Sequence, residues 1–251
     1  MKFINVTFPA PEQNLACDEA LLDYCEEVSD EEILRIWEPR EDFVVLGYSK
    51  SIEADVYLNN CLADQVPVLR RYSGGGTVLQ SPGVLNFALI LRIPESGPLS
   101  TIRGTNVSIL ERQRRALQSF AGGVIEHQGA TDLSIDGLKF SGNAQRRRSR
   151  CLLFHGAILY SMNIARVERY LRIPTQQPPY RENRAHREFL VNLTATPSAI
   201  VRALQEEWGA SEEFDHLPTQ GIEQIVRERY SQARWRIPPV RRSDKGSRPG
   251  G

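Results

Sequence analysis

Apolar and polar positions divide the first third of the chain into short strands and helices. Runs that alternate between apolar and polar residues, or stay apolar over a few positions, predict strands. In chain order these are Lys2–Phe8, Ile33–Trp37, Phe43–Leu46, Val66–Arg71 and Val84–Leu91. Because only a turn separates the second run from the third, we expect those two strands to pair. Apolar residues at helical spacing predict helices over Leu15–Glu27, capped by Asn14, and over Ile52–Gln65.

The rest of the chain continues this mixture of elements. Strands are predicted at Val124–His127, Asp132–Ile135, Leu138–Ser141 and Leu152–Tyr160, and helices at Ser100–Ser119, Ala165–Leu171, Pro197–Trp208 and Gln220–Tyr230. In the first of these helices the side chains expected in the core are Ile102, Val107, Leu110 and Leu117. The dipeptide Asp136–Gly137 is typical of a tight hairpin turn, so the strands on either side of it should pair.

Two segments lack any periodicity. Pro174–Arg187 is rich in proline and polar residues. Long irregular loops inside a compact domain are usually lids or binding loops, and we expect that role for this one. Arg241–Gly251 has no apolar side chains and is predicted to be a disordered tail, which leaves residues 1–240 as a single domain.

Composition narrows the class of protein. At 251 residues and 41% hydrophobic, the chain can bury one sizeable core. Lys+Arg and Asp+Glu are balanced at 31 each, so the sequence gives no sign of a nucleic-acid partner. It has no apolar run long enough to span a membrane. The four cysteines are scattered without a CxxC pair, which indicates neither zinc nor a disulfide framework and favours a soluble cytoplasmic protein.

Lysine is rare in this chain, and one lysine stands in an unusual setting. Only Lys2, Lys50, Lys139 and Lys245 occur among the 31 basic residues. Lys139 lies in an apolar strand and is followed by small residues whose backbone can approach a ligand closely. An ammonium is a compact charge, whereas a guanidinium needs room for its planar fork. Lys139 is therefore the candidate catalytic residue; the alternative is an ordinary lysine on a half-buried strand.

A run of three glycines follows a predicted strand and two arginines. The segment reads Arg70, Arg71, Tyr72, Ser73, Gly74, Gly75, Gly76 and Thr77. Backbone N–H groups freed by glycine, beside fixed cations, form a cradle for an anion. The segment is neither a Walker A loop, since no Gly-Lys-Ser/Thr follows, nor a dinucleotide-binding turn, since no suitable helix opens from it. A flexible hairpin loop is the alternative interpretation.

Together, the glycine run and the lysine segment resemble the lipoate–protein ligase family, part of the biotin/lipoate ligase and lipoyl- or octanoyl-transferase superfamily. The family signatures are an RRxSGGG[AT]V segment, a Lys-x-[SA]-G-[SN]-A segment and a following His-Gly on a strand. Their counterparts are the segments at 70–78, 139–144 and 155–156. The resemblance covers about residues 1 to 236. It implies an α/β (α+β) fold with a mixed, largely antiparallel sheet flanked by helices, in a short form without a C-terminal accessory domain.

The resemblance also implies a reaction and its partners. Lipoate or octanoate would attack the α-phosphate of ATP, with Mg²⁺ shielding the phosphates, to give acyl-AMP and pyrophosphate. The acyl group would then pass to one lysine of a carrier. The carriers implied are the lipoyl domain of an E2 subunit, a glycine-cleavage H protein or a dedicated lipoate-binding protein. The missing accessory function would lie on a separate chain or be dispensed with.

The site implied by the resemblance has Lys139 as its catalytic residue. Substrate and nucleotide binding fall to Arg70, Arg71, Ser73, Gly74, Gly75, Gly76, Thr77, Asn86, Asp132, Ser141, Gly142, Asn143, Ala144, His155, Gly156 and Arg184. Asp132 is in addition a candidate ligand for Mg²⁺. For His155 the alternative is a hydrogen-bonded residue of the core.

Two other functions remain as alternatives. A cysteine octanoyltransferase would take acyl groups from acyl carrier protein through a thioester, and Cys151 is the candidate thiol. The neighbouring run at 145–150, rich in arginine, would lower the pKa of such a thiol, although both the run and the cysteine have ordinary explanations as a solvated turn and a strand residue. A lipoyl-domain-binding protein without catalytic activity would be expected to have lost Lys139 or the arginine–glycine segment, and both are present.

Overall fold

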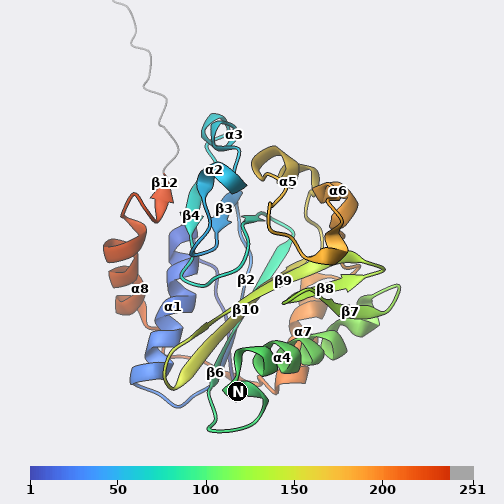
Figure 1. Cartoon of the computed structure of the whole chain (residues 1–251). Coiled ribbons are helices and arrows are strands. Elements are labelled where there is room, and N and C mark those ends of the chain that lie inside the picture. The colour runs from blue at the N-terminus through green and yellow to red at the C-terminus, as the bar shows by residue number, and fades with distance from the viewer. Residues whose placement is uncertain (238–251) are drawn as a thin grey trace, which may run out of the picture.

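Two β-sheets form the framework of the computed structural model, which describes residues 1–237 (Figure 1). The larger sheet has eight strands in the order β11-β1-β2-β6-β10-β9-β8-β7. Strand β1 runs parallel to β2 and β11, and all other neighbours are antiparallel, so the prediction of a mixed, largely antiparallel sheet is confirmed. The strands are β1 Lys2–Asn5, β2 Ile33–Trp37, β6 Val84–Arg92, β7 Ile125–Gln128, β8 Asp132–Ile135, β9 Leu138–Arg147, β10 Cys151–Leu159 and β11 Glu212–Glu213.

A smaller sheet has four strands in the order β12-β4-β3-β5. Its strands are β3 Phe43–Leu46, β4 Val68–Arg70, β5 Val78–Gln80 and β12 Arg236–Ile237. The predicted bounds of β2 and β3 match the structure, but the predicted pairing between them is wrong. β2 lies between β1 and β6, and β3 lies between β4 and β5, so neither strand has a free edge for the other.

Helices cover both faces of the larger sheet. The α-helices are α1 Pro11–Glu27, α2 Ile52–Asp55, α3 Leu58–Ala63, α4 Ile102–Leu117, α5 Ala165–Tyr170, α6 His186–Phe189, α7 Pro197–Trp208 and α8 Thr219–Ile225. α1 and α8 pack on one face together with the smaller sheet, and α4 and α7 pack on the other (Figure 1). Among the helices of residues 1–237, none combines the length and apolar composition needed to cross a membrane.

Tertiary contacts change two of the predicted helices. α1 begins at Pro11 rather than Leu15, because proline is well suited to the first position of a helix. Asn14 is therefore inside the helix and is not its cap; its side chain instead bonds the backbone N and O of Phe8, each at 2.9 Å. The helix predicted over 52–65 is broken into α2 and α3, because Val56 forms a β-bridge with Leu171.

Two further expectations differ from the structure, and a third cannot be compared with it. In α4, Ile102 and Val107 are exposed, and the core-facing positions include Ile109 and Leu110. The arginine run was predicted to be a solvated turn, but β9 continues through Arg147 and only the residues after it form the turn. The predicted tail at 241–251 and the last residues of the predicted domain lie outside the described residues.

A fully buried arginine joins α1 to the large sheet. Arg35 of β2 is 0% exposed, and its Nη1 lies 2.5 Å from Asp18 Oδ1 of α1. Nη1 also donates to the backbone oxygen of Asn14 at 2.8 Å, and Nη2 donates to that of Val6 at 3.2 Å, whereas Nε has no acceptor among residues 1–237. Burial by itself would raise the pKa of Asp18, but the charges of Arg35 and of His155 hold it below the usual value. The pair is thus ionised and locked in the core.

We predict that Arg35→Ala destabilises the protein by about 3–5 kcal/mol, because it leaves the Asp18 carboxylate buried without its cation. Urea unfolding would measure the loss as a lower midpoint at an unchanged slope. The exposed Arg103 provides a matched control, and Arg103→Ala should change the free energy of unfolding by less than about 0.5 kcal/mol. Equal effects of the two substitutions would contradict the prediction.

Candidate active site

A cavity of about 1070 Å³ opens between the two sheets. Its walls come from α1, the strands β3, β5, β6, β8, β9 and β10, the glycine segment and the loop after α5. The prediction that Pro174–Arg187 is a binding loop agrees with this geometry, since most of the segment from Pro174 to Asn183 lines the cavity. The cavity is therefore built from parts of the chain that are far apart in sequence.

Most of the predicted site residues meet at this cavity. Those that line it are Arg71, Gly75, Gly76, Thr77, Asn86, Asp132, Lys139, Gly142, Asn143, Ala144, His155 and Gly156. Five others are not among its lining residues: Arg70, Ser73, Gly74, Ser141 and Arg184. The expected juxtaposition of Lys139 with the glycine run is present, because both line the same cavity.

A β-bulge in β9 determines how Lys139 is presented. Where β8 advances by one residue, from Leu133 to Ser134, β9 advances by two, so Phe140 is an extra residue. A bulge of this kind shifts the alternation of side chains and re-aims them. Phe140 and Ser141 are buried in the core, while Lys139 lines the cavity. This explains why Ser141, predicted to contact substrate, does not reach it.

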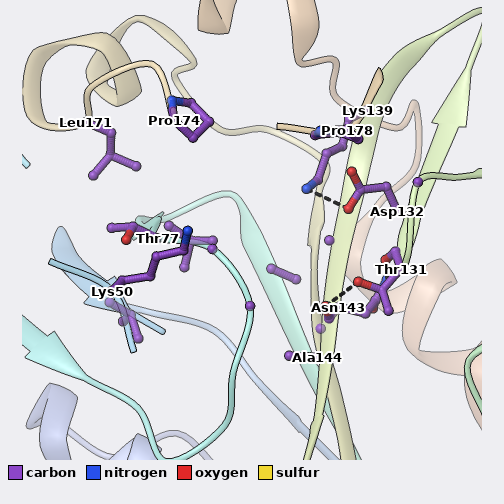
Figure 2. A pocket seen from close by; sticks show the side chains of 18 of the residues that line it. Lys50, Thr77, Thr131, Asp132, Lys139, Asn143, Ala144, Leu171, Pro174 and Pro178 are labelled. Carbon is purple, nitrogen blue, oxygen red and sulfur yellow. Dashed lines mark hydrogen bonds and ion pairs between the residues drawn. The ribbon is translucent and has the colours of Figure 1, made fainter. Parts of the chain in front are cut away.

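Lys139 is held by a carboxylate on the neighbouring strand. Its Nζ lies 2.8 Å from Oδ1 of Asp132 (Figure 2). Tyr180 donates its hydroxyl to Oδ2 of the same carboxylate at 2.9 Å. Burial and the charge of Asp132 raise the pKa of Tyr180, which therefore stays a donor. Both oxygens of Asp132 are thus engaged by the protein. Among residues 1–237 no group of three His, Cys, Asp or Glu side chains could hold a metal ion. The role of Asp132 as a Mg²⁺ ligand stays a prediction.

Small residues leave room for the Lys139 ammonium and for the side chain of Asn143. A Cβ at Gly142 would lie 2.7 Å from Lys139 Nζ, and a Cβ at Gly156 would lie 1.8 Å from Asn143 Oδ1. Asn143 donates to the backbone oxygen of Thr131 at 2.7 Å (Figure 2). Its Oδ1 is buried and has no partner among residues 1–237, so this wall of the cavity presents a free acceptor beside a cation.

Arg71 folds into the glycine loop. It donates to the backbone oxygens of Gly74 and Gly76 at 2.6 and 2.8 Å, and to Ser73 Oγ at 3.1 Å. Burial lowers the pKa of Arg71 to about 10, so the guanidinium is still charged at neutral pH. Gly75 adopts φ 89°, which favours glycine, and a Cβ there would lie 2.8 Å from the Arg71 guanidinium. The loop thus has a fixed conformation, and the interpretation as a flexible hairpin is wrong.

Two arginines predicted to bind substrate instead bind the protein backbone. Arg70 Nη1 donates to the carbonyl oxygens of Gly47, Tyr48 and Lys50, at 3.1, 3.0 and 2.6 Å. Arg184 Nη2 donates to the oxygens of Gly137 and Tyr180 at 3.0 and 2.6 Å. The planar fork of arginine suits such multiple contacts. Both guanidinium groups fix loops that border the cavity and neither lines it.

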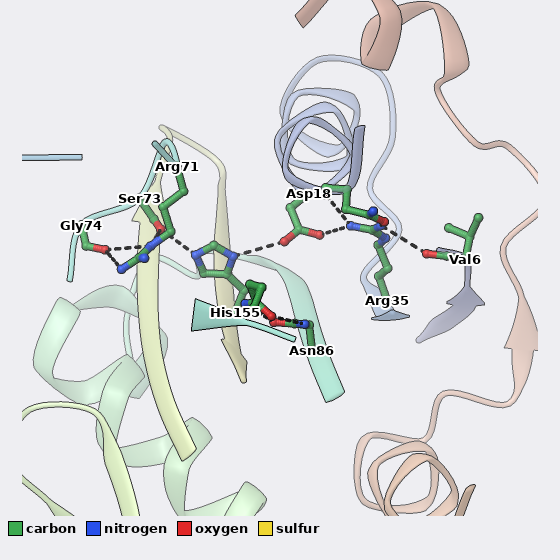
Figure 3. A network of polar contacts seen from close by, with 10 residues as sticks. Val6, Asp18, Arg35, Arg71, Ser73, Gly74, Asn86 and His155 are labelled. Atoms are coloured by element: carbon green, nitrogen blue, oxygen red, sulfur yellow. Dashed lines mark hydrogen bonds and ion pairs between the residues drawn. The ribbon is translucent and has the colours of Figure 1, made fainter. Parts of the chain in front are cut away.

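His155 connects the glycine loop to the buried ion pair. Its Nε2 lies 2.6 Å from Ser73 Oγ, and its Nδ1 lies 3.2 Å from Asp18 Oδ2 (Figure 3). Asp18 in turn holds Arg35. The order Ser-His-Asp resembles a nucleophilic triad, but Ser73 is 1% exposed and does not line the cavity. The network therefore anchors the loop, while His155 itself both lines the cavity and is satisfied by hydrogen bonds.

The cavity also has charged lining residues that the sequence analysis did not select. They are Asp18, Lys50, Asp55 and Arg172. Thr77 donates to Asp55 Oδ2 at 2.6 Å, which secures the end of the glycine loop. The rarity of lysine was a signal that pointed to Lys50 as well as to Lys139. The other three charged residues carry no comparable signal in the sequence, because their segments are brought together only by the fold.

The thiols lie away from this chemistry. All four cysteines fall within the described residues, each is at most 1% exposed, and none lines the cavity. Burial raises the pKa of Cys17 and of Cys25 to about 12, and that of Cys61 to about 11. Burial also raises the pKa of Cys151, whose Sγ donates to the backbone oxygen of Cys25 at 3.2 Å. The arginines beside Cys151 thus fail to activate it.

With this geometry in view, the sequence profile of the lipoyl protein ligase A/B catalytic domain matches residues 10–228. The chain belongs to this family. It is similar to the probable lipoate–protein ligase A of Mycoplasma pneumoniae, with 27% identity over 175 residues, which are 69% of this chain and 50% of that protein. The chain thus spans about half the length of that relative.

Two further relatives align over more of their own length. The lipoate–protein ligase A subunit 1 of Thermoplasma acidophilum is 25% identical over 246 residues, covering 91% of this chain and 93% of that protein. The octanoyltransferase LipM of Oceanobacillus iheyensis is 25% identical over 198 residues, covering 72% of each. Sequence similarity therefore extends to two kinds of acyl-transferring enzyme.

Solved structures share the fold. A bipartite lipoate–protein ligase of Thermoplasma acidophilum, studied with its E2 lipoyl domain, superposes with a TM-score of 0.78 at 22% identity, covering 93% of this chain and 94% of that one. A lipoate–protein ligase A with bound ATP gives a TM-score of 0.75 at 22% identity, covering 93% and 97%. These likenesses establish the ligase-like fold predicted from the sequence.

We predict that the thiols of the native protein react with a thiol reagent at neutral pH at least ~100-fold more slowly than the same thiols in urea. The thiolate is the reactive form, and burial opposes its formation. Spectrophotometric labelling should count four thiols after unfolding, and three in Cys151→Ala. Rapid labelling of one thiol in native protein, lost in Cys151→Ala, would contradict the prediction.

Proposed function

We propose that this chain is the catalytic part of an ATP-dependent lipoate– or octanoate–protein ligase. The observation that carries the proposal is that Lys139, held by Asp132, and the glycine loop line one cavity. Membership of the family and the likeness in fold to a ligase with bound ATP support it. The acid would be activated as acyl-AMP, and its acyl group would then pass to a lysine of a lipoyl carrier domain.

The charges of the cavity suit a nucleotide and an acid. The cationic lining residues are Lys50, Arg71, Lys139, Arg172 and Arg181, against the acidic residues Asp18, Asp55 and Asp132. In the first step a carboxylate oxygen attacks the α-phosphorus, and pyrophosphate leaves with the electron pair of the broken bond. Because two anions must meet, fixed positive charge at the reacting atoms lowers the barrier.

Lys139 is positioned to act in both steps. In the first, its ammonium would stabilise the charge that develops on the α-phosphate. In the second, the amine of the carrier attacks the acyl carbonyl, AMP leaves, and the same ammonium would stabilise the oxyanion. Asp132 and Tyr180 hold the lysine in place before substrate arrives. Mg²⁺ would enter with the phosphates of ATP, which supply most of its ligands in such sites.

The apolar lining of the cavity suits an acyl chain. It includes Leu15, Trp37, Val45, Val78 and Phe87. Two other apolar residues near the glycine loop do not contribute, because Leu89 is buried in the core and Tyr72 stacks against Arg146. The loop after α5 covers the other side, which would exclude water from a hydrolysable acyl-adenylate.

A lipoyl carrier domain is the proposed acceptor, and a second chain is a proposed partner. The Thermoplasma acidophilum relative is named a subunit 1, and its structural counterpart is described as bipartite and paired with an E2 lipoyl domain. The two align with more than nine-tenths of this chain.

An octanoyltransferase is the second candidate, favoured by the similarity to LipM. A thioester mechanism needs a thiol at the reacting atoms. The buried thiols, none of which lines the cavity, oppose it. A carrier-binding protein without catalytic activity would not need the ion pair of Lys139 and Asp132 in the cavity.

Release of pyrophosphate from ATP with free octanoate or lipoate tests the proposal. We predict release with at least one of these acids, and a fall of about 100-fold or more in Lys139→Ala, because a preorganised charge at the transition state is lost. Cys151→Ala should retain activity. Acyl transfer from acyl carrier protein without ATP, abolished in Cys151→Ala, would instead support the octanoyltransferase.

We further predict that Gly142→Ala separates activity from stability. The new Cβ would meet the mobile end of Lys139, at 2.7 Å from Nζ and 2.8 Å from Cε, and displace the ammonium. Pyrophosphate release should fall by up to ~100-fold through misplacement of one group. The free energy of unfolding should change by less than about 1 kcal/mol.

Gly122 provides the matched control, because a Cβ there would meet no atom within 4 Å. Gly122→Ala should leave pyrophosphate release unchanged. Normal turnover in Gly142→Ala would mean that the ammonium need not occupy its present position.

A further inference from the structure

A second lysine lines the cavity across from Lys139. Lys50 lies between β3 and α2, and Figure 2 shows it beside Thr77, with Lys139 and Asp132 on the opposite wall. No carboxylate of residues 1–237 lies within ion-pair distance of the Lys50 ammonium, whereas Lys139 has Asp132 at 2.8 Å. Two of the four lysines of the chain thus face one cavity, and one of them lacks a counter-ion in the described part.

The backbone around Lys50 is fixed by the glycine segment. Arg70 binds the carbonyl oxygens of Gly47, Tyr48 and Lys50, as described above. The backbone N–H of Tyr48 donates to Ser73 O at 2.9 Å. Gly47 lies so close to the loop that a Cβ would be 2.1 Å from the oxygen of Gly75. The loop bearing Lys50 and the glycine loop therefore form one unit.

A second cation borders the same wall. Arg172 is exposed and lines the cavity, and its guanidinium stacks over the ring of Tyr57 at 4.5 Å. Its backbone N–H donates to Asp55 O at 2.9 Å, which ties it to α2. Leu171 and Pro174, its neighbours in sequence, lie on the Lys50 side in Figure 2. The guanidinium has no protein acceptor among residues 1–237, so its donors are available to a ligand.

We propose that Lys50, together with Arg172, binds the β- and γ-phosphates of ATP and the departing pyrophosphate. This rests on the proposed function, and it assigns different tasks to the two lysines of the cavity. Lys139 lies across the cavity from Lys50 (Figure 2), and its ammonium suits the reacting carboxyl and α-phosphate, which are both anionic. The distal phosphates carry most of the charge of ATP, and charge-assisted hydrogen bonds from cations without acidic partners would hold them.

Arg172 is exposed, so a leaving group bound there can reach solvent, whereas Lys50 and Lys139 are both half-buried. Pyrophosphate must leave the site before the carrier lysine arrives, whereas the acyl-adenylate must stay. A carboxylate bound at Lys50 would lie far from the ammonium that serves the acyl carbonyl. Lys50 is thus a binding residue for the leaving group.

Lys50→Ala should raise the KM for ATP by about 10- to 100-fold, the loss expected for one charge-assisted hydrogen bond to a buried or half-buried anion. Inhibition by added inorganic pyrophosphate should weaken by a similar factor. Transfer from preformed octanoyl-AMP to a lipoyl carrier domain should be affected far less, because this substrate has no distal phosphates. Lys50→Arg should restore part of the ATP affinity.

Lys2 provides the control, since it lies at the surface and pairs with Glu212 at 2.9 Å. Lys2→Ala should leave the ATP dependence unchanged. An unchanged KM for ATP in Lys50→Ala, or equal losses in the two half-reactions, would overturn the assignment. Calorimetric titration with ATP tests the role of Lys50 independently of the proposed ligase activity. If the wild-type chain releases no pyrophosphate, the ligase proposal fails, and equal ATP affinities of wild type and Lys50→Ala would then overturn the role of Lys50.

Discussion

The buried pair of Arg35 and Asp18 is the interaction on which the site depends. An arginine and an aspartate without water must be paired, because either charge alone would be costly in the core. The pair fixes α1 against β2, and Asp18 extends the same network through His155 to Ser73 of the glycine loop. The core of the large sheet thereby determines where the loop stands. A binding loop made of glycines needs such an anchor, since it has no side chains of its own to pack.

The opposite wall is set by strand register. The hairpin turn at Asp136–Gly137 and the bulge at Phe140 together bring Lys139 into the cavity and keep Phe140 and Ser141 in the core. Asp132 comes from the adjacent strand, two positions from Ser134, the register partner of Lys139, so the ion pair is formed by two strands. The loops that border the cavity are tied down by arginine. Rigid strands hold the candidate catalytic group, and clamped loops hold the groups that surround it.

Periodicity predicted most strands, because burial of alternating side chains is a local property of the sequence, whereas the largely antiparallel sheet was implied by the family resemblance. Periodicity could not predict that β2 and β3 lie in different sheets, since pairing depends on partners far along the chain. The motifs predicted that the segments around Lys139 and Gly75 belong to one site, and both segments line one cavity. They misplaced Arg70 and Arg184, because a sequence shows that a cation is present and not which carbonyls occupy its donors. Arg172 was missed for the same reason, since its position follows from a contact with α2.

Three of the five cations around the cavity are arginines. A guanidinium stays protonated at any physiological pH and so has no free electron pair with which to attack an activated acyl group. An ammonium can lose its proton and become a nucleophile. Because most cations of the cavity are arginines, self-acylation in the proposed ligase would be restricted to the amines of Lys50 and Lys139. The scarcity of lysine would thus protect the proposed acyl-adenylate until its acceptor docks.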